Sequence, residues 1–345
     1  MAVVVSSAMS RKTIHLVNPF ASAFGGSERR ALDYHALLST DADVILWAER
    51  NPDVALAGYP FRRLDPAGGT LPHGGTLVLL GTSAERSHWL ARARPERLII
   101  VYNTPELQRL RRLIEFASEA ALPKPELVFP SVTHRASTQM AGFVDWGFYD
   151  FNLFRSAPRP QDSDAFVVGR LSRDTDYKHH PQDVRLYRQL VARGIHVRLM
   201  GATVLRERLG GSPAIELLPA GAVPAPSFLQ SLDAFVYRTD PTWREASGRV
   251  VVEAMACALP VVAGRSGGYR ELIVHGTNGF LFDTQTEAIG YIETLRSDRS
   301  LAQRVGHAAR TTVVSQLGEA HIARVREYFL GATDGTAFSI NSVSS

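Results

Sequence analysis

Short apolar runs alternate with amphipathic segments along the second half of the chain. Each run is rich in Val, Ile, Leu or Phe, and most are followed by a segment whose apolar positions have helical spacing. This alternation predicts β-α-β units, in which helices connect parallel strands. The strands predicted here are residues 165–169, 196–201, 214–218, 233–237, 260–264 and 279–282.

The first half repeats the pattern less regularly. Apolar runs predict strands, and two amphipathic segments at residues 27–38 and 106–117 predict helices between them. We therefore expect an α/β protein with two Rossmann-like domains that face each other, and a ligand site in the cleft between them, beyond the carboxyl ends of the strands. The strands predicted in this half are residues 13–18, 43–48, 76–81, 98–103 and 126–131.

The boundary between the domains is predicted where Pro, Ser and charged residues replace the pattern, in residues 154–164. We expect an N-terminal domain at residues 11–155 and a C-terminal domain at residues 160–318. Residues 1–10 and 333–345 are expected to be tails.

Composition favours a folded cytoplasmic protein. Hydrophobic residues make up 45% and charged residues 21% of the 345 residues, which is ordinary for a globular chain. Neither a signal peptide nor an apolar run long enough to span a bilayer is visible. The single cysteine, Cys257, lies in an apolar run and is expected to be a small buried side chain.

The net positive charge of the chain limits the kinds of binding partner that we expect. The formal net charge is +4 and the isoelectric point is about 9.3, which favours anionic partners such as phosphates or acidic lipid. Neither zinc-ligand spacing nor an aromatic and basic RNA-binding signature is present, so we expect no nucleic-acid partner.

Residues 245–282 carry the most specific motif. Two glutamates, Glu245 and Glu253, are separated by seven mostly apolar residues, and a glycine-rich segment follows. The segment resembles the signature of retaining, nucleotide-sugar-dependent glycosyltransferases of family 4, which have the two-domain GT-B fold. The residues that match it are Glu245, Gly248, Glu253, Ala254, Pro260, Gly267, Gly268, Glu271, Gly276, Asn278 and Gly279.

Two upstream segments extend the resemblance. The segment around Arg170 and Lys178 is similar to the family's strand-end Gly-Arg followed by a lysine, and Gly25 and Gly26 resemble its N-terminal glycine loop. The resemblance implies that Gly25, Gly26 and Asn103 lie against the donor. Asn103 is a departure, since many members have a histidine there. Asparagine can donate and accept hydrogen bonds but cannot carry a proton charge.

The resemblance implies a role for each matching residue. Arg170 and Lys178 would stabilise the negative charge that grows on the leaving diphosphate. Backbone N–H groups of a helix that begins near Gly248 would add a partial positive charge that stabilises it further. Glu245 would accept hydrogen bonds from the donor sugar, and Glu253 from the ribose hydroxyls.

The implied reaction moves a hexose, with retention, from a UDP- or GDP-sugar to a saccharide or lipid-linked acceptor, in polysaccharide or glycolipid assembly. No Asp-x-Asp motif is visible, so neither a metal nor another cofactor is expected. The resemblance also implies that a C-terminal helix, residues 319–331, packs on the N-terminal domain. His179 and His180 are expected to be solvated loop residues rather than metal ligands.

Other interpretations remain open. The chain could be a catalytically silent protein that binds a nucleotide sugar. Gly264 to Gly268 also satisfy G-x-S-x-G after a strand, the pattern of a serine hydrolase with Ser266 as nucleophile. The helix at residues 106–117 has an apolar face and three arginines, and either packs on a core or touches anionic lipid at the inner membrane face.

Overall fold

The structure, a computed structural model, describes residues 11–331 apart from 24, 84–85, 105 and 158–164. Contacts divide the chain into two units. The first unit comprises residues 1–128, 141–143 and 323–345, and the second comprises residues 129–140 and 144–322. Two separate sheets are present, as predicted for an α/β protein with two Rossmann-like domains.

The first sheet has seven strands in the order β3-β2-β1-β4-β5-β6-β7. The neighbours from β3 to β6 pair in parallel. Its strands are β1 (Thr13–Asn18), β2 (Asp43–Ala48), β3 (Phe61–Arg63), β4 (Thr76–Leu80), β5 (Arg97–Val101), β6 (Glu126–Phe129) and β7 (Phe143–Val144). Its helices are α1 (Gly26–Leu38), α2 (Ser87–Ala93) and α3 (Leu107–Glu119), with a 3-10 turn η1 (Val54–Leu56).

The second sheet has six strands in the order β10-β9-β8-β11-β12-β13, all paired in parallel. Its strands are β8 (Val167–Leu171), β9 (His196–Met200), β10 (Ile215–Leu218), β11 (Ala234–Tyr237), β12 (Val261–Gly264) and β13 (Phe280–Phe282). The α-helices of this part of the chain are α4 (Val132–Thr138), α5 (Asp183–Val191), α6 (Arg206–Leu209), α7 (Ala225–Gln230), α8 (Arg249–Ala256), α9 (Gln285–Ser297) and α10 (Arg299–Leu317), followed by α11 (Glu319–Leu330). Its 3-10 turns are η3 (Asp176–Lys178), η4 (Thr203–Leu205) and η5 (Gly268–Leu272).

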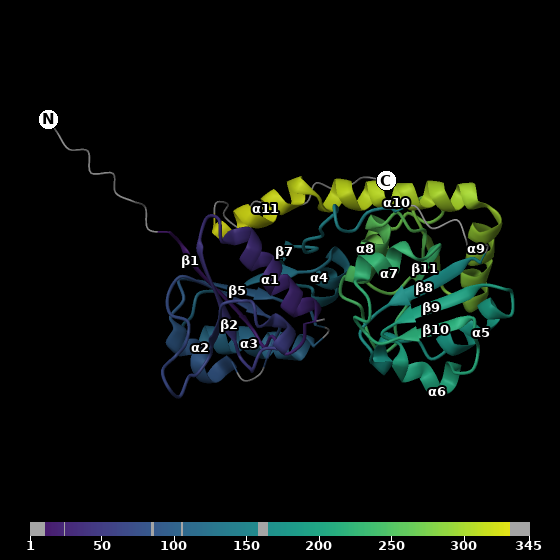
Figure 1. Ribbon diagram of the computed structural model, residues 1–345. Coiled ribbons are helices and arrows are strands. Elements are labelled where there is room, and N and C mark those ends of the chain that lie inside the picture. The colour runs from purple at the N-terminus through teal and green to yellow at the C-terminus, as the bar shows by residue number, and fades with distance from the viewer. Residues whose placement is uncertain (1–10, 24, 84–85, 105, 158–164, 332–345) are drawn as a thin grey trace. The chain divides into compact units, whose positions relative to one another are not determined.

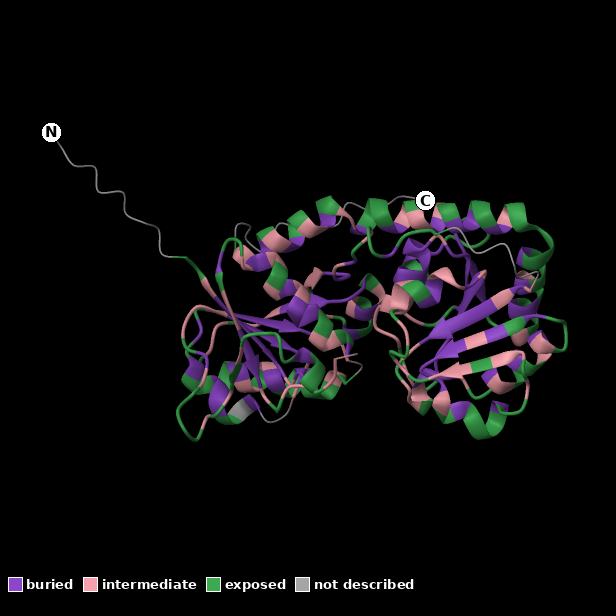
Figure 2. Cartoon of the chain, in the orientation of Figure 1, coloured by how far each residue is buried: buried purple, intermediate pink, exposed green. Residues whose placement is uncertain are grey.

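Helices cover both faces of the second sheet (Figure 1). On one face, α7, α8 and α10 bury their apolar residues against the strands, and on the other α5, α6 and α9 do so. The central strands of both sheets are buried while the outward faces of the helices are exposed (Figure 2). A parallel sheet covered on both faces requires such apolar strands, which is why the sequence reads as short apolar runs.

The contact-based division differs from the domain boundaries expected from sequence. Residues 129–140 group with the second unit because α4 is bonded to its loops. Ser131 donates from Oγ to the Ala246 carbonyl at 2.6 Å, and Glu271 accepts hydrogen bonds from the backbone of Val132 and Thr133. The expected break at residues 154–164 falls partly outside the described residues.

Helix α3 packs on the core of the first unit. Leu110, Leu113 and Ala117 are buried, whereas Arg111 and Arg112 are exposed. This arrangement accounts for the apolar face without a membrane. None of the helices in the described part of the chain is both long and apolar enough to cross a bilayer.

Candidate functional site

A cavity of about 660 Å³ lies in the second unit, at the carboxyl ends of β11, β12 and β13. Each of these strands ends next to residues that line it: Arg238 and Thr239 after β11, Gly264 and Arg265 at the end of β12, and Asp283 after β13. Ligands bind beyond the carboxyl ends of strands in open parallel sheets. The cavity therefore occupies the position at which this type of fold binds ligands.

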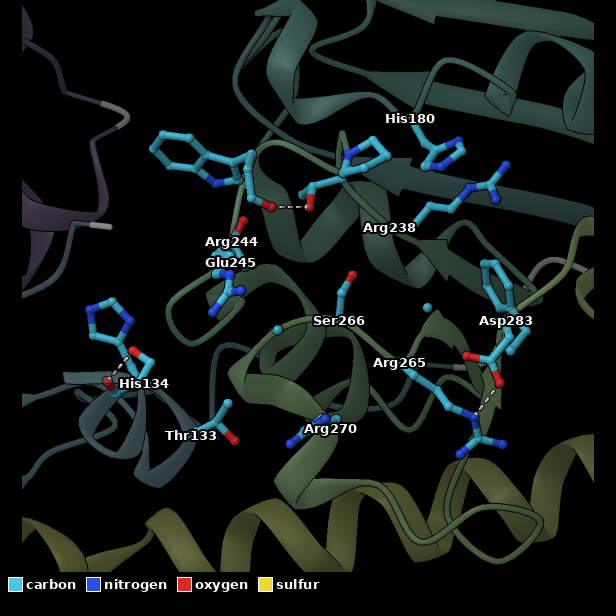
Figure 3. Close-up of a pocket in the computed structure, with 17 residues that line it drawn as sticks. Thr133, His134, His180, Arg238, Arg244, Glu245, Arg265, Ser266, Arg270 and Asp283 are labelled. Atoms are coloured by element: carbon cyan, nitrogen blue, oxygen red, sulfur yellow. Dashed lines mark hydrogen bonds and ion pairs between the residues drawn. The ribbon is translucent and has the colours of Figure 1, made fainter. Parts of the chain in front are cut away.

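Positive charge dominates the wall (Figure 3). Four arginines line the cavity, Arg238, Arg244, Arg265 and Arg270, against two carboxylates. One carboxylate, Asp283, is paired with Arg265 at 2.8 Å. The arrangement is suited to an anionic ligand.

Glu245, the other carboxylate of the wall, is held by two donors. Lys178 Nζ donates to Glu245 Oε2 at 2.5 Å, and the Tyr237 hydroxyl donates to the same oxygen at 2.9 Å. The lysine ammonium also lies 5.1 Å from the ring centre of Trp243, another residue of the wall. Both bonds fall on Oε2, so Oε1 is the oxygen that remains to accept from a ligand.

The charge state of Glu245 follows from these contacts. Burial by itself raises the pKa of the carboxyl, but the Lys178 ammonium and the hydrogen bonds from Lys178 and Tyr237 outweigh it and hold the pKa below its ordinary value. Glu245 is therefore a carboxylate at neutral pH, which can accept hydrogen bonds and has no proton to donate.

Two glycines shape the loop that carries Glu245. Gly248 has φ +80°, and a Cβ there would lie 2.4 Å from Tyr269 Cδ1. Gly267 has φ +120°, and its Cβ would lie 2.6 Å from Tyr269 Cε1 and 3.2 Å from Glu245 Cβ. The motif glycines thus let the Tyr269 ring pack beneath Glu245, a structural requirement that exists without any ligand.

Arg170 is buried rather than exposed to the cavity. Its guanidinium is 1% exposed and donates from Nη1 to Asp183 at 3.0 Å and to the Arg238 carbonyl at 3.0 Å. Nη2 donates to the Lys178 carbonyl. Arg170 therefore fixes the backbone that carries Lys178, and it is not among the residues that line the cavity.

Glu253 also lies behind the wall. It is 7% exposed on α8 and accepts a hydrogen bond from Arg249 Nε at 2.9 Å. Gly248 is the N-cap of this helix, and as a glycine it has no side chain with which to form a capping bond. The structure thus brings Glu245 and Lys178 together, with Arg170 behind them, whereas Glu253 is paired within its own helix.

The three predicted donor-binding residues near the N-terminus belong to the first unit. Gly25 is the N-cap of α1 and Gly26 is its first residue. Asn103 follows β5, and its Oδ1 is buried without a hydrogen-bond partner among the described residues. That oxygen can accept a bond from a ligand hydroxyl or amide.

The expectation that His179 is a solvated loop residue is wrong. The residue is 4% exposed and its Nε2 lies 3.0 Å from the Gly201 carbonyl, so Nε2 carries the hydrogen. Burial and the nearby Arg170 lower its pKa from 6.5 to about 3. Nδ1 is buried and has no partner in the described parts of the chain, so protonation would create an unsatisfied cation.

This burial predicts a pH dependence of stability. The folded state keeps His179 neutral while the unfolded state gains a proton below pH 6.5, so stability is full above pH 6.5 and falls toward pH 3. We expect His179→Gln to remove up to about 1.36 kcal/mol per pH unit from the slope of unfolding free energy below pH 6.5. Urea titrations at several pH values measure it, with the exposed His88→Gln as control. An unchanged slope in His179→Gln would contradict the buried neutral imidazole.

Sequence reasoning did not select Arg238, Trp243, His134 or Arg270, which all line the cavity. Arg238 had a usable signal, since it directly follows the predicted strand 233–237 and ligands bind beyond strand ends. His134 and Arg270 had none, because the fold alone places α4 beside η5. Cys257 is buried, as predicted, and burial raises its pKa to about 12.

The described part of the chain contains no group of three His, Cys, Asp or Glu side chains that could hold a metal ion. His180 is a cavity residue beside the buried His179, and its ring Nδ1 accepts the backbone N–H of Gln182 at 3.1 Å. Metal independence itself stays a prediction.

Comparison with solved structures identifies the architecture as GT-B. The chain superposes on Anabaena Alr3699/HepE in complex with UDP and glucose with a TM-score of 0.73 at 20% identity, covering 93% of this chain and 99% of that one. It superposes on WaaG, a glycosyltransferase involved in lipopolysaccharide biosynthesis, with a TM-score of 0.66 at 11% identity, covering 92% of this chain and 100% of that one. The GT-B expectation is confirmed.

Residues 154–312, somewhat less than half of the chain, match the family model described as Glycosyl transferases group 1. A curated relative, the capsular polysaccharide biosynthesis glycosyltransferase CapM of Staphylococcus aureus, is 29% identical over 163 residues, which cover 44% of this chain and 42% of CapM. The N-acetyl-alpha-D-glucosaminyl L-malate synthase of Bacillus anthracis is 40% identical over 76 residues, 21% of this chain and 20% of that protein. The matched segments thus span less than half the length of these relatives.

Proposed function

We propose that the protein is a retaining glycosyltransferase that moves a hexose from a nucleoside diphosphate sugar, with UDP or GDP as the nucleotide, to a saccharide or lipid-linked acceptor. The observation that carries the proposal is the cavity wall itself. It combines an excess of arginines with Glu245, whose carboxylate is paired with Lys178, at the carboxyl edge of a sheet within the segment that matches the glycosyl transferases group 1 model. HepE, with the same fold, was solved with UDP and glucose.

The two halves of the wall match the two halves of such a donor. A diphosphate needs positive charge where the bond to the sugar breaks, and Lys178 together with the wall arginines supplies it. A sugar needs acceptors for its hydroxyls, and Glu245 Oε1 provides one. The Lys178–Glu245 bond sets the two functions next to each other.

The same wall supports retention by front-face attack. Of the carboxylates among the described lining residues, Glu245 is bonded to Lys178 and Asp283 to Arg265, so neither is disposed as a separate covalent nucleophile. In the proposed step the anomeric C–O bond to the diphosphate breaks and a C–O bond to the acceptor forms on the same face. The acceptor hydroxyl proton passes to the departing phosphate oxygen, and the step needs no metal.

Release of nucleoside diphosphate tests the proposal. We expect the protein to liberate UDP or GDP from at least one nucleotide hexose in the presence of a saccharide acceptor pool, measured by a coupled diphosphate assay. Proton NMR of the product should show the donor's anomeric configuration. An inverted product would contradict retention.

A silent nucleotide-sugar-binding protein is the second candidate, and the same assay separates it. Binding of a nucleotide sugar without diphosphate release across the acceptor panel would support that candidate. The hydrolase interpretation is less well supported by the structure. Ser266 is hydrogen-bonded to Tyr269, and the segment after it is the 3-10 turn η5 rather than the α-helix of a nucleophile elbow.

Peripheral contact with anionic lipid also remains a proposal, and α3 gives it little support. The helix buries its apolar stripe in the core, and Arg109 is paired with Glu106 at 2.8 Å. A lipid-linked acceptor would have to reach the site by another surface.

A further inference from the structure

A buried carboxylate is shared by two arginines behind the cavity. Asp183, 2% exposed, accepts from Arg170 Nη1 at 3.0 Å through Oδ2 and from Arg238 Nε at 2.7 Å through Oδ1. Oδ2 also accepts the backbone N–H of His180 at 3.1 Å. One carboxylate therefore neutralises only one of two guanidinium groups, and the cluster keeps one unit of positive charge.

An uncompensated buried cation is costly unless something pairs with it. The ionisable ring side chains around the cluster do not supply a negative charge. The His180 imidazole can only be neutral or positive, and Tyr187 and Tyr237 stay neutral because burial raises the pKa of their hydroxyls. Asp240, close to His180, is a further carboxylate, and it accepts from Thr242. An anion in the cavity would compensate the remaining positive charge.

Of the two arginines, only Arg238 reaches the cavity wall. Arg170 donates from Nη1 and Nη2 to three acceptors of the protein. Its Nε is buried without a hydrogen-bond partner among the described residues, but the side chain does not line the cavity. Arg238 is 6% exposed, lines the cavity, and has a buried Nη2 that makes no hydrogen bond with the described residues. Its guanidinium carbon also lies 5.5 Å from the ring centre of Phe282, which fixes the side chain from the other side.

We propose that Arg238 binds the diphosphate of the donor directly, with Asp183 as the residue that positions it and Arg170 acting only through Asp183 and the backbone. The proposal rests on the proposed function and deepens it by naming a residue that contacts the phosphate. A guanidinium held by one carboxylate bond at Nε presents its terminal nitrogens to an anion in a fixed plane, which suits a phosphate better than a mobile ammonium does. His180 lies next to it at the same end of the cavity (Figure 3).

Inorganic pyrophosphate tests the contact without assuming a nucleotide. We expect Arg238→Gln to weaken pyrophosphate and UDP binding at least about tenfold by calorimetry, as loss of a charge-assisted bond does. Arg304→Gln removes the same charge from the exposed surface of α10 and should leave both affinities unchanged. Arg265→Gln removes a charge from the wall that is already paired with Asp283, and should cost less than Arg238→Gln.

Arg238→Lys keeps the charge and loses the planar fork, so it decides the matter if the glutamine variant does not fold. We expect a loss of several-fold from it. Wild-type pyrophosphate affinity in a folded Arg238 variant, or a loss no larger than that of Arg265→Gln, overturns the assignment. If pyrophosphate binds through Arg238 but no nucleotide or nucleotide sugar binds, Arg238 is still an anion-binding residue, whereas its assignment to the donor and the proposed function both fail.

Discussion

Replacing Lys178 by alanine is expected to lower kcat/KM for glycosyl transfer about 100- to 1000-fold, the effect of removing one fixed electrostatic donor from a reacting centre. The ammonium is held at 2.5 Å from Glu245 and faces Trp243, so it is positioned before the donor arrives. Loss of the ammonium removes the positive charge that stabilises the anionic leaving group. It also removes the main partner of the Glu245 carboxylate.

Steady-state kinetics of the folded variant measure this effect, with the exposed Lys124→Ala as control. Lys178→Arg should recover part of the loss, because it restores the charge but not the geometry. Turnover in Lys178→Ala within a factor of a few of the wild type would exclude the lysine from the reaction.

Replacing Arg170 by alanine is expected to lower the free energy of unfolding by about 3–5 kcal/mol, as happens when one partner of a buried ion pair is removed. The substitution breaks the bond to Asp183 and leaves the carbonyls of Lys178 and Arg238 without their donor. It also removes a guanidinium carbon that lies 4.9 Å from the ring centre of Tyr237.

Chemical denaturation measures this loss, and Arg304→Ala on the exposed face of α10 is the matched control. A ligand-contacting arginine would behave differently, since its removal would abolish donor binding while leaving stability near that of the wild type. That second result would return Arg170 to the cavity and contradict its role as a buried support.

Most of the fold could be predicted because it depends on local pattern. The runs at residues 13–18 and 43–48 are the observed strands β1 and β2, and each predicted run in the second half overlaps an observed strand. The short strands β3 and β7 escaped prediction, because three and two residues are too few for a periodic pattern.

The site was harder to predict from the sequence than the fold, for a physical reason. The motif identifies which residues matter but does not say which side chain faces the cavity and which lies behind it. Arg170 follows a strand-end glycine just as a ligand-binding arginine would. Its guanidinium nevertheless donates to Asp183 and two carbonyls, and Arg238, which also donates to Asp183, is the arginine that lines the cavity. These pairings join residues 8 to 68 positions apart and depend on the folded chain.

Calorimetric titration with UDP, GDP and their hexose conjugates measures directly whether the protein binds a nucleoside diphosphate sugar. We expect at least one nucleoside diphosphate to bind, and the corresponding nucleoside without phosphate to bind far more weakly. We also expect Glu245→Gln to weaken binding of the sugar conjugate more than binding of the diphosphate alone. A ligand at about 100 times its dissociation constant should also raise the free energy of unfolding by about 2.7 kcal/mol. Absence of binding by every diphosphate and conjugate at millimolar concentration would contradict the account.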